Sequence, residues 1–497
     1  MLNRKTLLLT ALLAIAGGIS ESAAGSDAER ITRVVAPTSD FSSAEKYETM
    51  QGGATTHLKR INGDVFSHPS ANMAFERRLD FEIGDGIFKK MWVSSPASTK
   101  SSDGLGPLYN ARSCQRCHLK DGRGAPPVGV HAGSVALLIR LSVPPRNDAE
   151  RALLEAGTVH AIPDPVYGGQ LQPFATPGLD AEAQVEISYE PVPIALADGT
   201  MIELRKPTVT LADPAYGAIR NDLMISARIA TPMIGLGLLE ALSEEDILSW
   251  ADPDDRDGDG VSGRPNRVMS ALHREVMLGR FGWKANEPTL KDQVSAAFAG
   301  DLGISSSVHP ANAGDCTEAQ PVCLDAPHGG DAEDGNVEVN DHLLDLVTFY
   351  SRNLSVPARR KVDDPSVLAG KRVFYETGCI ACHRPKYVTP RDPLRPEQSF
   401  QLIWPYTDML LHDMGDGLAD NRPDGNADGR EWRTPPLWGI GLTDTVNGHT
   451  FFLHDGRARN LLEAILWHGG EAASARDRVL ALSKQEREHL LRFLNSL

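Results

Sequence analysis

The sequence predicts a mainly α-helical protein whose middle segment mixes strands and helices in an α+β arrangement. Apolar residues recur with helical periodicity at 235–251 and 340–354. Between about 130 and 215 the pattern changes to short stretches of alternating or β-branched residues, broken by Gly and Pro. Two Cys-x-x-Cys-His stretches, 114–118 and 379–383, each follow a segment of helix and loop. We therefore expect helical regions on both sides of a strand-containing middle.

The first 24 residues are typical of an export signal. Arg4 and Lys5 precede the apolar stretch 6–18, and the small residues of 21–25 offer a cleavage site, which we place after Ala24. The alternative is an uncut membrane anchor, but the stretch is short compared with the roughly 20 residues that span a bilayer. We expect a periplasmic protein with no membrane span once the signal is removed.

The rest of the chain divides into three expected segments. Residues 25–130 hold a polar, loosely held arm and then the helix and loop of the first Cys-x-x-Cys-His region. Residues 131–355 form the mixed middle segment, in which Ser243 and the acidic residues after it are typical of a helix start. A hinge at 356–367 leads into the last segment, 365–497, which is rich in helix. Strands of the middle segment are expected at 135–143, 183–192 and 201–211.

Length and charge limit the classes of partner. The chain has 497 residues, of which 41% are apolar, enough for a well-packed core and for two or three domains. Its formal net charge is −16 at pH 7. A negative field opposes binding to DNA, RNA or anionic lipid, so nucleic acid is excluded as a partner, whereas a basic protein partner is favoured.

The two Cys-x-x-Cys-His stretches predict two covalently bound haem c groups. In this motif the two thiols add to the vinyl groups of haem, and the adjacent histidine ligates the iron. A redox dithiol does not require the histidine, and a zinc site would need a second pair of ligands nearby. The helix expected before Gly378 and the second motif is typical of a cytochrome c-like haem domain. The residues expected to bind haem are Cys114, Cys117, His118, Cys379, Cys382 and His383, with His118 and His383 on the iron.

The remaining cysteines, Cys316 and Cys323, lie close together in a turn-rich stretch. In an exported protein they predict a local disulfide, since each has no other free partner. A pair of metal-binding thiols is the alternative.

An acidic loop offers a candidate calcium site. Asp255, Asp257 and Asp259 alternate along the chain and are followed by Gly260, as in loops that bind calcium through oxygen ligands. The twelfth position is Asn266 instead of the bidentate glutamate of an EF-hand, so the loop is not an EF-hand. The sequence is equally compatible with a calcium-binding loop and with a solvated acidic turn.

From about Ala44 to its C-terminus the chain resembles the di-haem oxidoreductase family of peroxidase-like proteins, also called thiol oxidoreductase-like. The resemblance lies in "GLGPLYNARSCQRCHLKDGRG", "DPDDRDGDGVSGRPNRV", "LGRFGWKAN", "EWRTPPLWGIGL" and "FLHDGRARNLLEAILWHGGEA". The family is more distantly similar to bacterial di-haem cytochrome c peroxidases and to the di-haem maturase of methylamine dehydrogenase. Those enzymes lack the large middle segment found here.

The resemblance implies that one haem handles peroxide and the other receives electrons from a small donor protein. The peroxidatic pocket of these relatives carries a distal glutamate after a string similar to "FLHDGRARNLLEA", which implies a catalytic role for Glu463. In the relatives this string belongs to the first haem domain, whereas here it follows the second haem motif. A similar string occurs in their electron-transfer domain, so a structural role for Glu463 at a helix start is equally open.

The second axial ligands do not follow from the sequence. Methionine raises the potential of a haem, a second histidine lowers it, and a vacant position permits peroxide binding. For the first haem no candidate is preferred among His57, His68, Met91 and His131. For the second haem the candidates are His412 and Met414, which share one loop, together with His449 and His454.

We expect a periplasmic di-haem c-type oxidoreductase that reduces peroxide, or uses peroxide to oxidise a partner. Hydrogen peroxide is the expected substrate, and a small, basic electron-donor protein is the expected redox partner. The alternative is a non-catalytic di-haem electron-transfer cytochrome that serves a respiratory or metal-uptake partner. An enzyme needs a vacant or displaceable position on one iron, whereas a carrier holds both irons with two strong ligands.

Overall fold

The computed structural model describes residues 26–99 and 102–497. The expected export signal and its cleavage site lie outside these residues. The described chain belongs to two compact units, one ending at Ala36 and one running from Pro37 to Leu497. In the first unit, Ser26 and Glu29 form a capping box at the start of helix α1 (Asp27–Val35). The remaining elements belong to the second unit.

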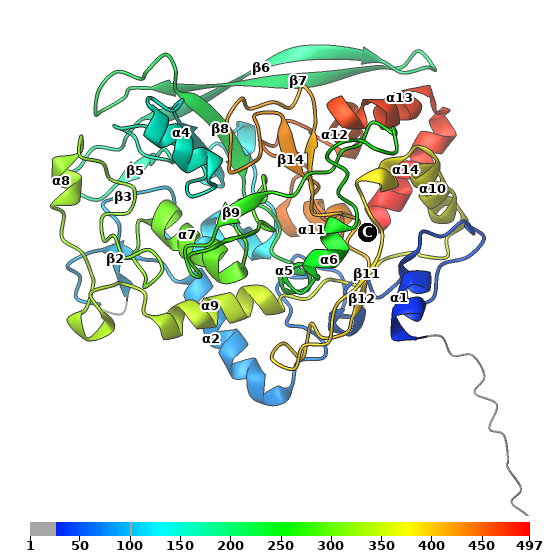
Figure 1. The fold of residues 1–497 in the computed structure, drawn as a ribbon, viewed down its shortest axis with the longest axis horizontal. Coiled ribbons are helices and arrows are strands. Elements are labelled where there is room, and N and C mark those ends of the chain that lie inside the picture. Colours follow the sequence, from blue (N-terminus) through cyan, green and yellow to red (C-terminus); the bar gives the residue numbers. More distant parts are fainter. Residues whose placement is uncertain (1–25, 100–101) are drawn as a thin grey trace, which may run out of the picture. The chain divides into compact units, whose positions relative to one another are not determined.

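Strands pair in small sheets throughout the second unit. The longest pair is the antiparallel ribbon of β6 (Gln184–Ala195) and β7 (Met201–Ala212), which Figure 1 shows as a long hairpin. Its apolar residues alternate with exposed ones and pack on the largest core cluster. Strand β4 (Leu137–Ser142) pairs antiparallel with β8 (Met224–Ile229). These strands confirm the three that the sequence predicts.

The other strands are short and position loops. The parallel pair is β1 (Val93–Ser94) with β2 (Asp103–Leu105). The antiparallel pairs are β3 (Leu108–Tyr109) with β5 (Phe174–Ala175), β9 (Arg267–Met269) with β10 (Val276–Leu278), β11 (Tyr387–Val388) with β12 (Leu402–Ile403), and β13 (Leu411–Asp413) with β14 (Glu431–Arg433).

Long helices pack in pairs around the two Cys-x-x-Cys-His regions. Helix α9 (Asp341–Asn353) lies against α2 (Arg78–Lys89) and α7 (Leu290–Leu302), and α10 (Pro365–Glu376) lies against α14 (Lys484–Ser496). Glycine allows the second contact, since a Cβ at Gly370 would lie 1.9 Å from the carbonyl oxygen of His489.

The remaining helices of the second unit are shorter. They are α3 (Cys114–Cys117), α4 (Asp148–Glu155), α5 (Leu236–Glu240), α6 (Glu244–Leu248), α8 (Pro321–Leu324), α11 (Thr443–Asn447), α12 (Leu461–Leu466) and α13 (Ala473–Ala481). Single 3-10 turns are η1 (Gly53–Thr55), η2 (Phe75–Arg77), η4 (Leu119–Asp121), η5 (Gly129–His131), η6 (Ala332–Asp334), η7 (Cys379–Ala381), η8 (Ile440–Leu442) and η9 (Gly470–Ala472). No helix of the described residues is long and apolar enough to cross a membrane.

The expectation of a mainly α-helical fold is confirmed only in part. Helices and strands are mixed along the second unit and joined by long loops. The helix expected at 235–251 is two helices, because Ser243 is extended and its side chain caps α6 by accepting from the amide of Asp246. The cap itself confirms the prediction.

The part of the expected arm that belongs to the second unit, and the expected hinge, both contain buried side chains. Glu48, in the arm, is buried and forms ion pairs with Lys371 of α10 and with Arg359 of the expected hinge. The Arg359 side chain also donates to the hydroxyl of Ser496 at the end of α14. Buried charges of opposite sign thus join the start, middle and end of the unit.

Candidate haem sites

Each Cys-x-x-Cys-His region lines a cavity. The second cavity, at Cys379–His383, has a volume of about 440 Å³, which lies in the usual range of ligand pockets. The first cavity, at Cys114–His118, is smaller, with a volume of about 180 Å³.

Local structure presents His383 to the second cavity. Helix α10 ends at Glu376, and Gly378, with a φ of 83°, turns the chain into η7. The backbone amide of His383 donates to the carbonyl of Cys379, and the ring Nδ1–H donates to the carbonyl of Tyr406 at 2.9 Å. This bond leaves Nε2 unprotonated, and burial lowers the pKa of His383 to about 4, so the ring is neutral.

His118 is held in the same way at the first cavity. Its amide donates to the carbonyl of Cys114, the first residue of α3, and its Nδ1–H donates to the carbonyl of Thr231 at 2.8 Å. Burial lowers the pKa of His118 to about 4. Both histidines therefore meet the requirement for a neutral iron ligand whose second nitrogen is fixed by the protein.

The cysteines divide as the sequence predicts. The four cysteines of the two motifs are free thiols that line the cavities, and burial raises the pKa of Cys114 to about 12 and of Cys379 to about 11. The structure joins Cys316 to Cys323 by a disulfide, with 6.0 Å between their Cα atoms.

Two buried arginines provide an independent test of the fit to haem. Arg123 and Arg433 line both cavities, and burial lowers the pKa of each to about 10. No carboxylate among residues 26–99 and 102–497 forms an ion pair with either one, and the Nε–H of Arg123 has no acceptor there. Asp408 acts electrostatically on Arg433, whereas burial alone accounts for the lowered pKa of Arg123. A buried cation without a counterion is costly, and the propionates of haem would supply one for Arg123. The residues present fit the group.

The two cavities are neighbours. Besides the two arginines, Trp283 and Pro435 line both of them. The indole of Trp283 is fixed because its Nε1–H donates to the carbonyl of Ile229 at 2.8 Å. An aromatic side chain therefore lies between the two sites.

His412 and Met414 both line the second cavity, but their side chains are not equally free to bind iron. The Nδ1 of His412 lies 2.7 Å from a carboxylate oxygen of Glu471, and its Nε2 lies 2.8 Å from one of Asp408. These contacts occupy both nitrogens, so His412 is placed unfavourably for an axial ligand, and its role in binding iron stays a prediction. Together with Cys382 and Asp408 it forms a group that could hold a metal ion only while the thiol is free. Met414 stays a candidate.

The other expected axial ligands are placed less favourably. His454 lines the second cavity but stacks on Trp432, with ring centroids 3.7 Å apart and planes 10° from parallel. His449 lines neither cavity; its Nε2–H donates to the carbonyl of Arg123. The four candidates for the first haem do not line the first cavity: His57, His68, Met91 and His131. The sequence pattern alone could not separate these residues from ligands.

Glu463 lines neither cavity. Its carboxylate accepts from the backbone amide and the Nε of Arg459 and from the side chain of Asn460, which in turn caps α12. This position favours the alternative that the sequence left open, a structural role at a helix start, and a catalytic role for Glu463 stays a prediction.

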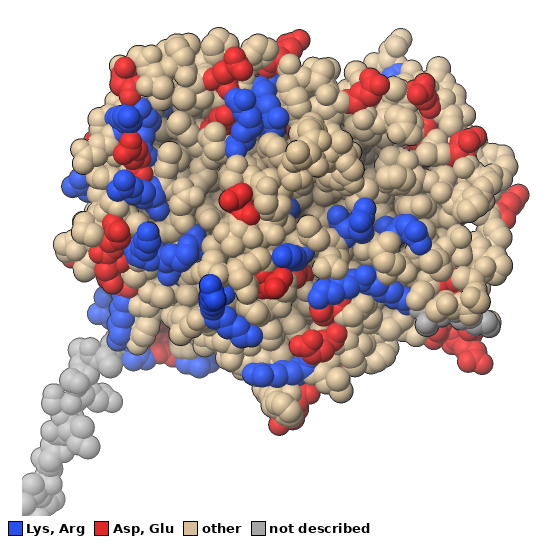
Figure 2. Space-filling view, turned by 180° about the vertical axis from the view of Figure 1, so that it is seen from behind, with Lys and Arg blue, Asp and Glu red and all other residues tan. Residues whose placement is uncertain are grey.

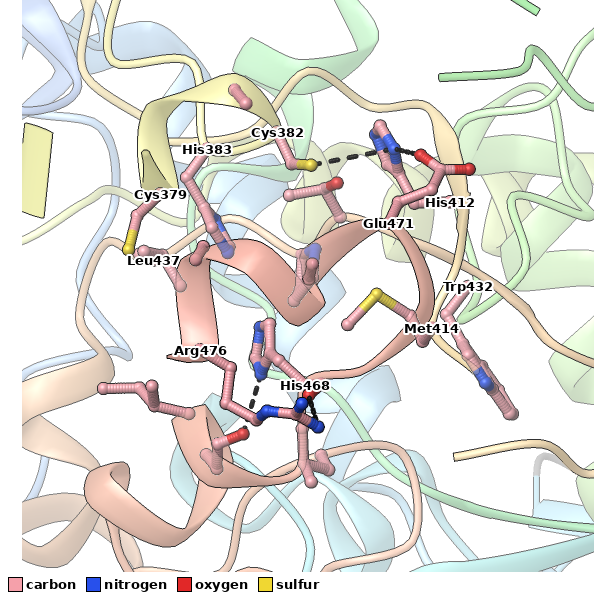
Figure 3. Close-up of a pocket in the computed structure, with 18 of the residues that line it drawn as sticks. Cys379, Cys382, His383, His412, Met414, Trp432, Leu437, His468, Glu471 and Arg476 are labelled. Carbon is pink, nitrogen blue, oxygen red and sulfur yellow. Dashed lines mark hydrogen bonds and ion pairs between the residues drawn. The ribbon is translucent and has the colours of Figure 1, made fainter. Parts of the chain in front are cut away.

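His468 is a cavity residue that sequence reasoning missed. It follows α12 and lines the second cavity, where Figure 3 shows its ring and that of His383 pointing toward one another. The signal that could have found it is its place in "LLEAILWHGGEA", within a stretch that carries the family resemblance.

The acidic loop lies beside the second cavity. The ligand oxygens of Asp255, Asp257 and Asp259 lie within 4.8 Å of one another, and all three residues are exposed. Asp259 also lines the second cavity. Calcium binding here stays a prediction.

Comparisons with known proteins match the chain to one family. Residues 46–497 match the family described as "Di-haem oxidoreductase, putative peroxidase". No curated protein matches the chain. Among solved structures, hydrazine synthase from Kuenenia stuttgartiensis, pressurized with xenon, is similar at 19% sequence identity, covering 33% of this chain and 57% of that chain, with a TM-score of 0.21. This chain thus spans little more than half of that one, and we conclude nothing about function from this similarity.

Proposed function

The chain belongs to the di-haem oxidoreductase family, and from this we propose that it is an exported, peroxidase-like oxidoreductase with two covalent haem c groups. The observation that supports the proposal is the pair of adjacent cavities. Each has two free thiols and, directly after the second of them, a histidine whose Nδ1 is held by a backbone carbonyl. Cys114, Cys117 and His118 would hold one haem, and Cys379, Cys382 and His383 the other, each in a cytochrome c-like site.

The haem groups, when bound, supply one-electron redox chemistry. The chain supplies orientation and charge. The carbonyls of Thr231 and Tyr406 fix the two histidine rings, and Arg123 and Arg433 neutralise carboxylates that enter either cavity. Trp283, held by its hydrogen bond to Ile229, lies on the path between the sites.

The first cavity is the better candidate for peroxide. His118 is the only histidine that lines it among the described residues, and Met233 is the only methionine. Met233 lies two residues beyond the carbonyl that holds His118, and it shares a buried cluster with Phe88, whose ring lies 6.2 Å from that of His118. With one histidine and one methionine among its described lining residues, this cavity offers fewer possible second ligands than the second cavity does, which favours peroxide binding here.

We further propose that export delivers the protein to the periplasm, where a small electron-donor protein reduces it. The net charge of −16 supports a basic donor. Basic and acidic side chains are interspersed on the face drawn in Figure 2, so this face has no acidic patch that would attract such a donor. Calcium at Asp255, Asp257 and Asp259 remains part of this proposal.

Mass spectrometry of protein made with a haem-attachment system tests the proposal. We expect two covalent haems on wild type, impaired attachment at the first site in Cys117→Ala, and impaired attachment at the second site in Cys382→Ala. The paired variant Cys316→Ser with Cys323→Ser is the matched control and keeps both haems, because its cysteines lie in the disulfide. Hydrogen peroxide added to wild type should shift the Soret band within the mixing time.

Two outcomes would contradict this proposal. A mass with fewer than two haems on wild type removes the di-haem assignment. Two attached haems that remain low-spin in every redox state, with only slow bleaching by peroxide, favour the electron-transfer cytochrome instead.

A further inference from the structure

The side chain of His468 is fixed by its neighbours and presents one nitrogen to the second cavity. Its Nδ1–H donates to the carbonyl of Ala464 in α12 at 2.8 Å, and its own carbonyl accepts from the Nη1 of Arg476 at 3.1 Å. The turn after it is tight, since Gly470 has a φ of 52° and a Cβ there would meet the carbonyl oxygen of Asp413. No hydrogen bond to the Nε2 of His468 occurs among residues 26–99 and 102–497.

This arrangement repeats that of His383. In both, Nδ1–H donates to a backbone carbonyl, the ring is largely enclosed by protein, and Nε2 is left for the cavity. A carbonyl on Nδ1 is the usual way in which proteins fix a histidine that ligates a metal through Nε2. His383 comes from the start of the last segment and His468 from near its end, and Figure 3 shows the two rings facing each other.

The other residues of the second cavity are weaker candidates for the same role. His412 has carboxylates on both ring nitrogens. His454 lies flat against Trp432, and its Nε2 is 3.6 Å from the carboxylate of Asp455. Among the described residues no hydrogen bond fixes the thioether of Met414, whereas His468 is held at both its ring and its backbone.

We propose that His468 is the second axial ligand of the haem attached at Cys379 and Cys382, which places that iron between two imidazoles. The inference rests on the haem attachment proposed above. The assignment gives the two sites different roles. The second haem, with both axial positions occupied, serves electron transfer. The first cavity, where His118 is the only histidine among the described lining residues, keeps an axial position for peroxide. Two imidazoles also give the second haem a lower potential than an imidazole and a thioether would give.

Electron paramagnetic resonance and near-infrared spectra of the ferric holoprotein test the assignment. Wild type should contain one low-spin haem with the charge-transfer band of bis-histidine iron. His468→Ala should lose that component completely and gain a high-spin one, and added imidazole should restore the low-spin signal. His468→Met should keep one low-spin haem but show the band of a histidine–methionine pair and a raised reduction potential. Met414→Leu, which conserves volume in the same cavity, is the matched control and should match wild type.

The contrary results are distinct. If His468→Ala keeps the bis-histidine spectrum with two haems attached, or if Met414→Leu abolishes it, His468 is not the ligand. If wild type carries no haem on the Cys379–Cys382 peptide, the attachment itself fails, which the mass shows before any spectrum is recorded. Should His468→Ala not fold, His468→Met decides, since an unchanged bis-histidine band in that variant overturns the assignment.

Discussion

At the residue scale, what a buried histidine can do depends on what its ring nitrogens contact. His118, His383 and His468 each donate Nδ1–H to a backbone carbonyl and keep Nε2 for a cavity. His412 lies in the same cavity as two of them, but carboxylates engage both of its nitrogens. Burial lowers the pKa of His118 and His383, whereas Asp408 beside His412 holds the pKa of that ring above its ordinary value despite burial. Of these four histidines, only the three that donate to a carbonyl can bind iron as neutral imidazole.

The role of Glu463 is decided by an isosteric substitution. Because its carboxylate supports Arg459 and the start of α12 and lines neither cavity, we expect Glu463→Gln to lower the free energy of unfolding by about 1 kcal/mol. The reaction with peroxide should stay within a few-fold of wild type. Urea unfolding and stopped-flow mixing measure the two effects. A slowing of about 10²–10⁴-fold with both haems attached would restore Glu463 as a general acid–base.

At the element scale, polar side chains connect segments that are distant in sequence. Glu182, just before β6, accepts from the backbone amide of Gln172 and from the side chain of Gln320, which precedes the disulfide-bonded Cys323. The disulfide loop is thereby joined to the base of the β6–β7 ribbon. Burial raises the pKa of Glu182 to about 8, with Asp315 and Asp164 nearby adding to the effect.

This buried carboxyl makes the stability depend on pH. The folded pKa lies above the ordinary value of 4.5, so the folded state binds the proton more tightly and stability falls as pH rises from about 4.5 to about 8. We expect Glu182→Gln to remove about 3–5 kcal/mol of that fall, since each pKa unit is worth about 1.4 kcal/mol. Urea unfolding at a series of pH values measures the slope. Glu186→Gln, an exposed glutamate on β6, is the control and should leave the slope unchanged. An equal slope in Glu182→Gln and wild type would contradict the prediction.

At the scale of the whole molecule, the chain from Pro37 to Leu497 folds as one compact unit. Residues from its strand-containing middle and from its C-terminal helices share one buried cluster. The two haem motifs, far apart in sequence, therefore line neighbouring cavities with Trp283 on the wall of each. This proximity allows two redox groups to act on one reaction.

A substitution of Trp283 tests whether its indole serves electron transfer between the two cavities. Trp283→Phe leaves the carbonyl of Ile229 without its donor, so we expect a loss of about 1–3 kcal/mol in the free energy of unfolding. Both haems should remain attached, and electron transfer between them should slow, which rapid-reaction spectroscopy of half-reduced protein measures. Trp432→Phe, at a tryptophan that lines the second cavity alone, is the matched control. Equal rates in wild type and Trp283→Phe would show that the indole does not serve the transfer.

The sequence by itself determined the features that depend on neighbours along the chain. Cys114, Cys117 and His118 lie within one turn, as do Cys379, Cys382 and His383, so spacing alone predicts both candidate sites. The Ser243 cap, the alternating residues of β6 and β7, and the disulfide between Cys316 and Cys323 are local in the same sense.

Only the tertiary structure decided how distant segments meet. Which of the histidines after His383 faces its cavity depends on the hydrogen bonds of each ring, and these involve Asp408, Glu471 and Ala464. The ion pair of Glu48 with Arg359 joins residues that are distant in sequence. The position of Trp283 between the cavities likewise depends on contacts between distant segments. The physical reason is that a ring nitrogen or a buried charge is satisfied by whatever lies beside it in space, and periodicity along the chain carries no record of that neighbour.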